Sequence, residues 1–180
     1  PSASTLCAGG QTTFTVGASG SNPTYQWQES TDNGASWNNI NNGGVYSGAA
    51  TSVLTLTNVT AVMSGNQYRA VVTGTAVCGI PINSGAGLLT VNTAPAITTQ
   101  PVASTTLCAG NNTTYTVVAN GTALTYQWQL STTGAGGPWT DISNTGVYSG
   151  SATASLTITG VVVGMDTYQY RAVVSGTCTP

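Results

Sequence analysis

Polar and apolar residues alternate along much of the chain, with the two-residue period of a β-strand that buries one face. The clearest example is residues 53–57, where Leu54 and Leu56 fall on one face and Thr55 and Thr57 on the other, and residues 155–159 repeat this pattern. Gly, Asn, Ser and Pro interrupt the alternation about every 8 to 12 residues, and no stretch keeps a helical period. The pattern predicts an all-β protein, with strands in the first half at residues 12–17, 24–29, 37–40, 52–58, 67–73 and 87–91.

Eight landmark residues recur about 100 residues further along the chain. The first set is Cys7, Trp27, Trp37, Tyr46, Met63, Tyr68, Arg69 and Cys78, and the second is Cys108, Trp128, Trp139, Tyr148, Met165, Tyr170, Arg171 and Cys178. A repeat of this length that keeps its cysteine and aromatic positions indicates one domain used in series. We therefore predict a domain at residues 1–92, an extended linker with two prolines at 93–101, and a second domain at 102–180.

The two repeats differ at their C-terminal ends. After Cys78 the first repeat continues to the predicted strand at residues 87–91, whereas only Thr179 and Pro180 follow Cys178. We therefore expect the second domain to lack its last strand, which leaves an open sheet edge. Two explanations stay open. The sequence is a segment of a longer array, or a strand from a neighbouring subunit fills the gap and links subunits head to tail.

Charged residues make up 3% of the chain, where about 25% is usual for a soluble domain. The acidic residues are Glu29, Asp32, Asp141 and Asp166, the basic residues are Arg69 and Arg171, and there is no Lys or His. The net charge of −2 provides little repulsion between molecules and so favours self-association. Two isolated arginines cannot form the basic patch that nucleic acids require. Since no apolar run reaches about 18 residues, we expect no membrane insertion.

Few residues are available for catalysis or metal binding. Without His or Lys, the Ser-His, Cys-His and Lys-based nucleophile systems are excluded. Paired carboxylates, as in glycoside hydrolysis, would remain, but the acidic positions differ between the repeats. The cysteines lack the CxxC spacing of zinc sites. We expect no enzymatic activity, no cofactor and no metal.

The four cysteines fall two per repeat, at nearly the same separation. Matching separations favour one disulfide within each repeat, Cys7 with Cys78 and Cys108 with Cys178, over the other two pairings. Disulfides form in oxidising compartments, so we expect an extracellular or cell-surface protein.

The order of the landmarks resembles that of an immunoglobulin-like sandwich, in which a tryptophan on the third strand packs between the sheets. Trp27 and Trp128 match that tryptophan. The segment 166–170 resembles the family's corner motif, an Asp four residues before a Tyr, and Ser64 replaces the Asp in the first repeat. The family's usual core cysteines are missing, since Val16 and Ala70 stand near their positions. The resemblance implies that the structural core includes Trp27, Trp128, Tyr68, Tyr170 and Asp166.

Four linked motifs, Leu-Cys-Ala-Gly, Tyr-Gln-Trp-Gln, Val-Tyr-Ser-Gly and Gln-Tyr-Arg-Ala-Val-Val, make the chain similar to bacterial immunoglobulin-like repeats. Such repeats occur in very large secreted and surface proteins and are often exported by type IX secretion. The resemblance implies a structural or adhesive repeat unit of an extracellular filament, stalk or surface adhesin, whose partners are copies of itself and, as a second class, glycans. The alternative is a carbohydrate-binding or spacer module of a secreted hydrolase.

Arg69 and Arg171 are the only cations of their repeats, and each follows a corner tyrosine. One interpretation packs the arginine stem and bonds its head to backbone carbonyls or to a nearby acid such as Asp166. The other makes each arginine a ligand contact beside an aromatic that stacks on a sugar ring. Tyr46 and Tyr148 are the candidates for that aromatic, and their alternative role is the packing of a loop edge.

Residues 30–37 match the pattern SxDxGxxW. The pattern predicts a hairpin turn in which the carboxylate of Asp32 accepts turn amides, Gly34 takes a positive φ and Trp37 folds over the loop. The alternative pairs Glu29 with Asp32 as calcium ligands or as an acid and a base. Because calcium usually gathers several carboxylates, the hairpin is the favoured interpretation.

Overall fold

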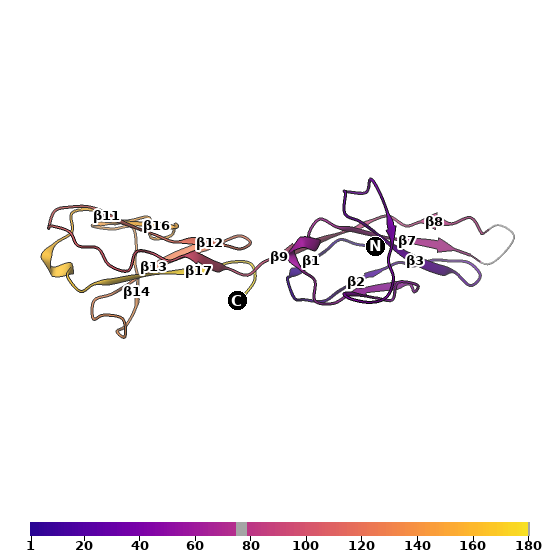
Figure 1. Ribbon diagram of the computed structural model, residues 1–180, viewed down its shortest axis with the longest axis horizontal. Helices are drawn as coiled ribbons and strands as arrows, with labels where there is room; N and C mark the ends of the chain where they lie inside the picture. Colours follow the sequence, from indigo (N-terminus) through magenta and orange to yellow (C-terminus); the bar gives the residue numbers. More distant parts are fainter. Residues whose placement is uncertain (75–78, 180) are drawn as a thin grey trace. The chain divides into compact units, whose positions relative to one another are not determined.

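A computed structural model describes residues 1–74 and 79–179 and divides the chain into two compact units, Pro1–Thr93 (unit 1) and Ala94–Pro180 (unit 2). Each unit stacks β-sheets around an apolar core, so the all-β fold of two tandem immunoglobulin-like sandwiches is confirmed. Figure 1 shows the two layers clearly in unit 2, with β11 and β16 in one layer and β13 and β17 in the other.

The larger sheet of unit 1 has the strand order β1-β9-β7-β3-β4, with β8 also paired to β7. These strands are β1 (Ser4–Cys7), β9 (Gly87–Asn92), β7 (Gln67–Thr73), β3 (Thr24–Ser30), β4 (Asn38–Asn39) and β8 (Ile82–Asn83). The second sheet contains β2 (Thr12–Thr15), β6 (Val53–Leu56) and β5 (Tyr46–Ser47), and the short 3₁₀ helix η1 (Ala61–Met63) precedes β7. The β1–β9 pair is parallel, whereas the other pairs of unit 1 are antiparallel.

Unit 2 repeats this plan with fewer strands. One sheet is β14 (Thr140–Asp141), β13 (Thr125–Ser131) and β17 (Gln169–Ser175), and the facing sheet is β11 (Thr113–Thr116), β16 (Ser155–Ile158) and β15 (Tyr148–Ser149). A separate ribbon pairs β10 (Ala96–Thr99) with β12 (Val118–Asn120), and the 3₁₀ helix η2 (Val163–Met165) precedes β17. No described residue after β17 forms a strand.

Alternation along the central strands creates both cores. Trp27 and Trp128 have 0% of their surface exposed, and Leu54, Leu56 and Leu156 are equally buried. The indole N–H of each tryptophan donates to a backbone carbonyl of the opposite sheet, Trp27 to Thr51 and Trp128 to Thr153, at 2.9 Å in both cases. These bonds satisfy the one polar group that each buried indole carries.

The corner residues behave differently in the two units. Tyr68 is fully buried, whereas Tyr170 is half-buried. Asp166 was predicted as a core residue but is exposed, and it forms the C-terminal cap of η2 through its backbone N–H, which donates to Val163. In unit 1 the strand β9 pairs with β7 beside Tyr68, whereas among the described residues of unit 2 only β13 pairs with β17.

The predicted linker is also partly wrong. Residues 96–99 form β10, which pairs with β12 of unit 2. Prolines at positions 95 and 101 favour extended backbone, and extended backbone is what strand pairing requires.

The cysteines do not follow the prediction for the second repeat. Cys108 is a free, exposed thiol, whereas Cys178 is buried and disulfide-bonded, so the predicted Cys108–Cys178 bond is wrong. Cys7 is disulfide-bonded, and its predicted partner Cys78 lies outside the described residues. Cys7 ends a strand held by β9, but Cys108 lies in a segment without strand pairing, so nothing in unit 2 holds it as β9 holds Cys7.

Candidate functional site

A row of side chains crosses the outer face of the larger sheet in unit 1. The guanidinium of Arg69 on β7 lies over the ring of Trp37, with 4.2 Å between the guanidinium carbon and the ring centroid. Its Nε donates to the side-chain oxygen of Gln28 on β3 at 2.9 Å, and the amide of Gln28 donates to Asn39 on β4 at 2.9 Å. The row therefore links three adjacent strands through one cation and one aromatic ring.

Unit 2 builds the same row from its own residues. Arg171 lies over Trp139 at 4.3 Å and donates through Nε to Gln129 at 2.8 Å, and Gln129 donates to Asp141 at 2.8 Å. We call these two sets the cation–aromatic rows. Their recurrence explains why an Arg and a second Trp recur in each repeat.

The cation–aromatic rows show which partners the two arginine side chains bind. Neither Nε bonds to a backbone carbonyl or to Asp166, as one interpretation expected, since each bonds to a glutamine of the neighbouring strand. Each arginine also covers one face of its tryptophan, so that face is closed to a sugar ring. Trp37 and Trp139, which were not among the candidate ligand contacts, are half-buried. Each tryptophan lies 32 residues before its arginine in the sequence, and this separation hid the pairing.

Tyr46 belongs to a half-buried polar cluster. Its hydroxyl donates to Glu29 Oε1 at 2.7 Å, and the same oxygen accepts bonds from Asn66 at 2.7 Å and from the Tyr68 hydroxyl at 3.0 Å. Burial raises the pKa of Tyr46 to about 12, and burial also raises the pKa of Tyr68 well above its usual range. Burial and the nearby carboxylate both favour neutral hydroxyls, so these tyrosines serve the interior of the sandwich.

In unit 2 the corresponding cluster has no carboxylate, because Leu130 occupies the position of Glu29. The hydroxyls of Tyr148 and Tyr170 lie 3.2 Å apart and bond to each other. Burial raises the pKa of Tyr170 well above its usual range. Tyr148, like Tyr46, therefore uses its hydroxyl within its own unit.

The glycine of the repeated Val-Tyr-Ser-Gly motif has a purely steric role. Gly48 and Gly150 both have φ of +79°, and a Cβ at either position would lie 2.1 Å from a backbone carbonyl oxygen of the next strand. No other residue fits this turn without a backbone shift. The motif is thus explained by the path of the chain around β5 and β15.

The predicted hairpin at residues 30–37 forms as expected. The carboxylate of Asp32 accepts bonds from the Ser30 hydroxyl at 2.7 Å and from the Ser36 amide at 2.8 Å. The Trp37 indole donates to the Gly34 carbonyl at 3.1 Å, and Gly34 has φ of +89°. The Ser36 hydroxyl and amide, together with Ser30, lower the pKa of Asp32 to about 2. The carboxylate of Asp32 therefore stabilises the turn through these hydrogen bonds.

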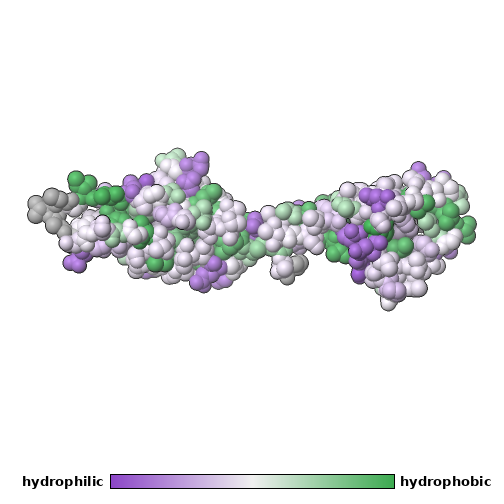
Figure 2. Space-filling view, turned by 180° about the vertical axis from the view of Figure 1, so that it is seen from behind, coloured by the Kyte–Doolittle hydropathy of each residue, from purple (hydrophilic) through white to green (hydrophobic). Residues whose placement is uncertain are grey.

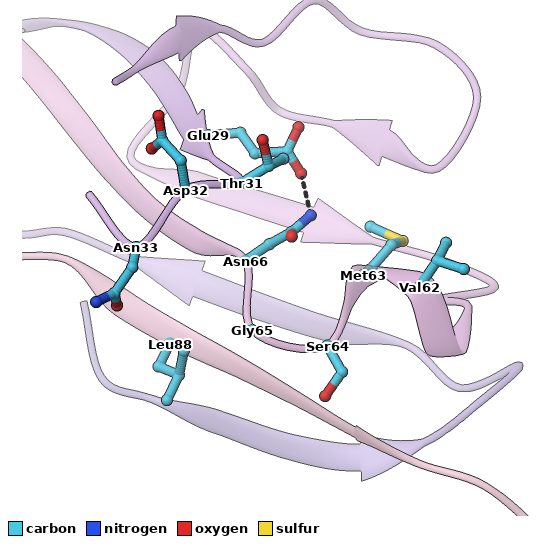
Figure 3. Close-up of a pocket in the computed structure, with 10 residues that line it drawn as sticks. All are labelled: Glu29, Thr31, Asp32, Asn33, Val62, Met63, Ser64, Gly65, Asn66 and Leu88. Carbon is cyan, nitrogen blue, oxygen red and sulfur yellow. Dashed lines mark hydrogen bonds between the residues drawn. The ribbon is translucent and has the colours of Figure 1, made fainter. Parts of the chain in front are cut away.

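A shallow pocket lies beside Glu29 and Asp32, with a volume of about 720 Å³. Figure 3 shows Glu29 and Asn66 pointing toward each other across it, joined by their hydrogen bond, while the Asp32 side chain points away from that pair. Among the described residues, no three His, Cys, Asp or Glu side chains gather as they would in a metal site. In the same part of the chain, no helix is long and apolar enough to cross a membrane.

A second depression, of about 570 Å³, lies in unit 2 between β17, η2 and the segment 102–109. Its lining includes Tyr115, Tyr170, Met165 and Val161, the counterparts of the buried unit 1 residues Phe14, Tyr68, Met63 and Val59. Figure 2 shows hydrophobic surface at the η2 end of unit 2, at the right of that view, where Val162 and Val163 are exposed.

Comparison with known proteins supplies a family for the first repeat. The family described as Domain of unknown function (DUF8696) matches residues 1–93. The chain belongs to this family. No curated protein matches the chain. The DUF8696 match covers unit 1, and unit 2 repeats its core and its cation–aromatic row.

Solved structures show the fold of this DUF8696 protein. The I-band fragment I67-I69 from titin is 20% identical, with a TM-score of 0.65 over 97% of this chain and 61% of the fragment. Extracellular domains 3–5 of Drosophila OTK are 19% identical, with a TM-score of 0.58 over 98% of this chain and 55% of that one. An eight-domain fragment of Down Syndrome Cell Adhesion Molecule is 16% identical, with a TM-score of 0.52 over 89% of this chain and 18% of that one. The chain is thus similar to tandem immunoglobulin domains and spans less than two thirds of each fragment.

Proposed function

We propose that the chain is a structural or adhesive repeat unit of an extracellular filament, stalk or surface adhesin, which works through association between domains and between subunits. The observation that carries the proposal is the duplication itself. Both units build the same core and the same cation–aromatic row, and no three His, Cys, Asp or Glu side chains gather among the described residues. A module repeated for its shape and surface fits a mechanical role better than a chemical one.

The extracellular setting rests on two supports. Cys7 and Cys178 are disulfide-bonded, as expected in an oxidising compartment. The titles of similar structures name extracellular domains and a cell adhesion molecule. The bacterial, type IX secretion-associated setting belongs to the same proposal and rests on the sequence motifs.

The composition of the surface supports association without steering by charge. With 3% charged residues, contacts between units depend on hydroxyls, amides and apolar patches. Such contacts change little with salt, because no dense charge pattern is present to be screened. A polymer of these units should therefore persist over a wide range of ionic strength.

Electron microscopy of material released from cells, labelled with antibody against the recombinant chain, tests the proposal. We expect the label on regularly spaced filaments or strings of domains, and on the surface of intact cells. Label found only after cells are permeabilised, or only on isolated particles, would overturn the filament role.

The alternative, a carbohydrate-binding or spacer module of a secreted hydrolase, is supported by one feature. Trp37 and Trp139 are half-buried aromatics at equivalent positions on the outer sheet face of each unit. Glycan-array binding that disappears in a Trp37→Ala, Trp139→Ala double variant would favour this alternative. Absence of binding together with regular filaments would remove it.

A further inference from the structure

Each unit fixes its single basic side chain and leaves one edge of it open. The Nε of Arg69 donates to Gln28 at 2.9 Å, and the guanidinium carbon lies 4.2 Å from the ring centroid of Trp37. Arg171 is held in the same way, with its Nε bond at 2.8 Å and Trp139 at 4.3 Å. Within residues 1–74 and 79–179, no hydrogen bond uses the Nη atoms of either arginine. Their N–H groups therefore remain for an outside acceptor.

Both guanidinium groups can be reached from solvent. Arg171 is exposed and Arg69 is half-buried. Arg69 lies on the outer face of its sheet, since its neighbours Tyr68 and Ala70 are both 0% exposed and point into the core. A side chain that is already fixed loses little rotamer freedom when a ligand binds, and the planar fork of an arginine matches the two oxygens of a carboxylate. Each row is therefore prearranged to bind a carboxylate.

Amide side chains surround the fork in unit 1. Gln28 lies opposite Arg69 in the strand register, Gln67 lies two residues before it on the same face, and Asn39 continues the row. Amides both donate and accept hydrogen bonds, so they suit the hydroxyls of a sugar. Strands β3 and β7 are paired on both sides, so their main chain offers no edge for a peptide strand. These surroundings favour an acidic sugar over an acidic peptide.

The two rows differ by one charge. The amide of Gln129 in unit 2 donates to the carboxylate of Asp141, and the neutral Asn39 occupies the same position in unit 1. Asp141 lies one side chain away from the guanidinium and should repel a second anion there. In unit 1, Glu29 accepts the bonds of its tyrosine cluster and Asp32 accepts those of its hairpin. We therefore expect the row of unit 1 to bind an anion more tightly than the row of unit 2.

We propose that each cation–aromatic row binds one carboxylate of an acidic sugar, of the uronic acid class, through the open Nη edge of its arginine. The flanking amides bind the sugar hydroxyls, and the tryptophan keeps the guanidinium in place on its covered face. The inference rests on the adhesive part of the proposed function and names the chemistry of the partner. The duplication then places one such contact on every repeat.

The test is an NMR titration of the whole chain with an oligogalacturonate. The chain has two arginines, so Nε–H signals report the two rows separately once Arg69→Lys and Arg171→Lys have assigned them. We expect both signals to shift saturably at roughly millimolar sugar, as suits one charge-assisted contact with a few neighbours. The methyl ester of the same oligosaccharide keeps every ring and hydroxyl but loses the charge, and it should leave both signals in place.

Three variants test the role of the row. Arg69→Lys keeps a cation over Trp37 but loses the planar fork, so binding at unit 1 should weaken more than about fivefold while unit 2 stays unchanged. The indole signal of Trp37 checks that unit 1 remains folded. Asp141→Asn should tighten binding at unit 2 about twofold at low salt, and Asn39→Asp should weaken unit 1 by a similar factor.

Several outcomes would overturn the inference. These are equal shifts with the methyl ester, full binding by Arg69→Lys, and equally tight binding of a glutamate peptide, which would remove the sugar as the partner.

The same experiments separate this inference from the proposed function. Regular filaments on cells together with no binding of the oligogalacturonate would overturn the carboxylate site and leave the repeat-unit function standing. Binding of the oligogalacturonate by a chain that is found only on isolated particles would support the site and overturn the filament role.

Discussion

The ring of Phe14 fills the space that a side chain on Gly87 would need. A Cβ at Gly87 would lie 2.9 Å from two ring carbons of Phe14 and 2.6 Å from the Ser2 carbonyl oxygen. This glycine is therefore required by close packing between the two sheets, and the same ring position in unit 2, Tyr115, is left uncovered.

Replacement of Gly87 by Val should destabilise unit 1 by about 1–3 kcal/mol, because the added carbons push against the Phe14 ring and the Ser2 backbone. Urea denaturation followed by tryptophan fluorescence measures the change. Gly85→Ala is the matched control, since a Cβ there has no neighbour within 4 Å. Equal stabilities for the two variants would contradict the packing argument.

Removal of the Glu29 carboxylate should destabilise unit 1. Glu29→Ala leaves the hydroxyls of Tyr46 and Tyr68 and the amide of Asn66 without their acceptor, at a cost of about 1–3 kcal/mol. Glu29→Gln should cost less, because the amide oxygen still accepts. A double variant with Tyr46→Phe should lose less than the sum of its parts, and simple additivity would show that the bond contributes nothing.

The cation–aromatic rows should each contribute a measurable coupling. A double-mutant cycle of Arg69→Ala and Trp37→Ala should give about 0.5–1 kcal/mol, the usual range for an exposed cation–π pair. The Arg171 and Trp139 cycle should give a similar value in unit 2. A coupling free energy found in only one unit would show that the same Arg–Trp geometry does not stabilise both units equally.

Alkaline pH should weaken the fold through its buried tyrosines. The pKa of Tyr46 is raised from 10.0 to about 12, and those of Tyr68 and Tyr170 are raised as well. A raised pKa means that the folded state holds the proton more tightly, so this stability is complete below about pH 10 and is lost as pH rises from 10 through 12. Tyrosinate absorbance in the folded chain and urea midpoints across this range measure the effect, and Tyr46→Phe should reduce it.

The free thiol of Cys108 should react in the native protein. Because the thiol is exposed, one equivalent of a maleimide should attach without denaturant, and peptide mapping should find it at Cys108. Cys108→Ser should abolish this labelling. Failure of Cys108 to react in denaturant until a reductant is added would restore the predicted bond with Cys178.

Several features could be predicted because they leave a local trace in the sequence. The strands β3, β7 and β9 lie within a residue of their predicted bounds, since their alternation is long and bounded by turn residues. The short strands β5 and β8 were missed because two residues cannot show a period. The hairpin around Asp32 was predictable because every partner lies within a few residues of it.

The candidate site was harder to predict because its contacts join distant residues. Arg69 was singled out as a lone cation, but its partners Gln28 and Trp37 lie on other strands, and only the β3–β7 register brings them to it. Tyr46 was proposed as a ligand contact because exposure cannot be read from an aromatic in a loop motif. Its position against Glu29 depends on how the two sheets stack.

The sequence by itself determined the all-β class and the duplication of one domain, because periodicity and repetition are properties of the linear chain. Only the tertiary structure decided that Arg69 stacks on Trp37, that the Tyr46 hydroxyl donates to Glu29 and that Cys108 stays free. The physical reason is that these features depend on strand register and sheet stacking, which bring together residues that no local pattern connects.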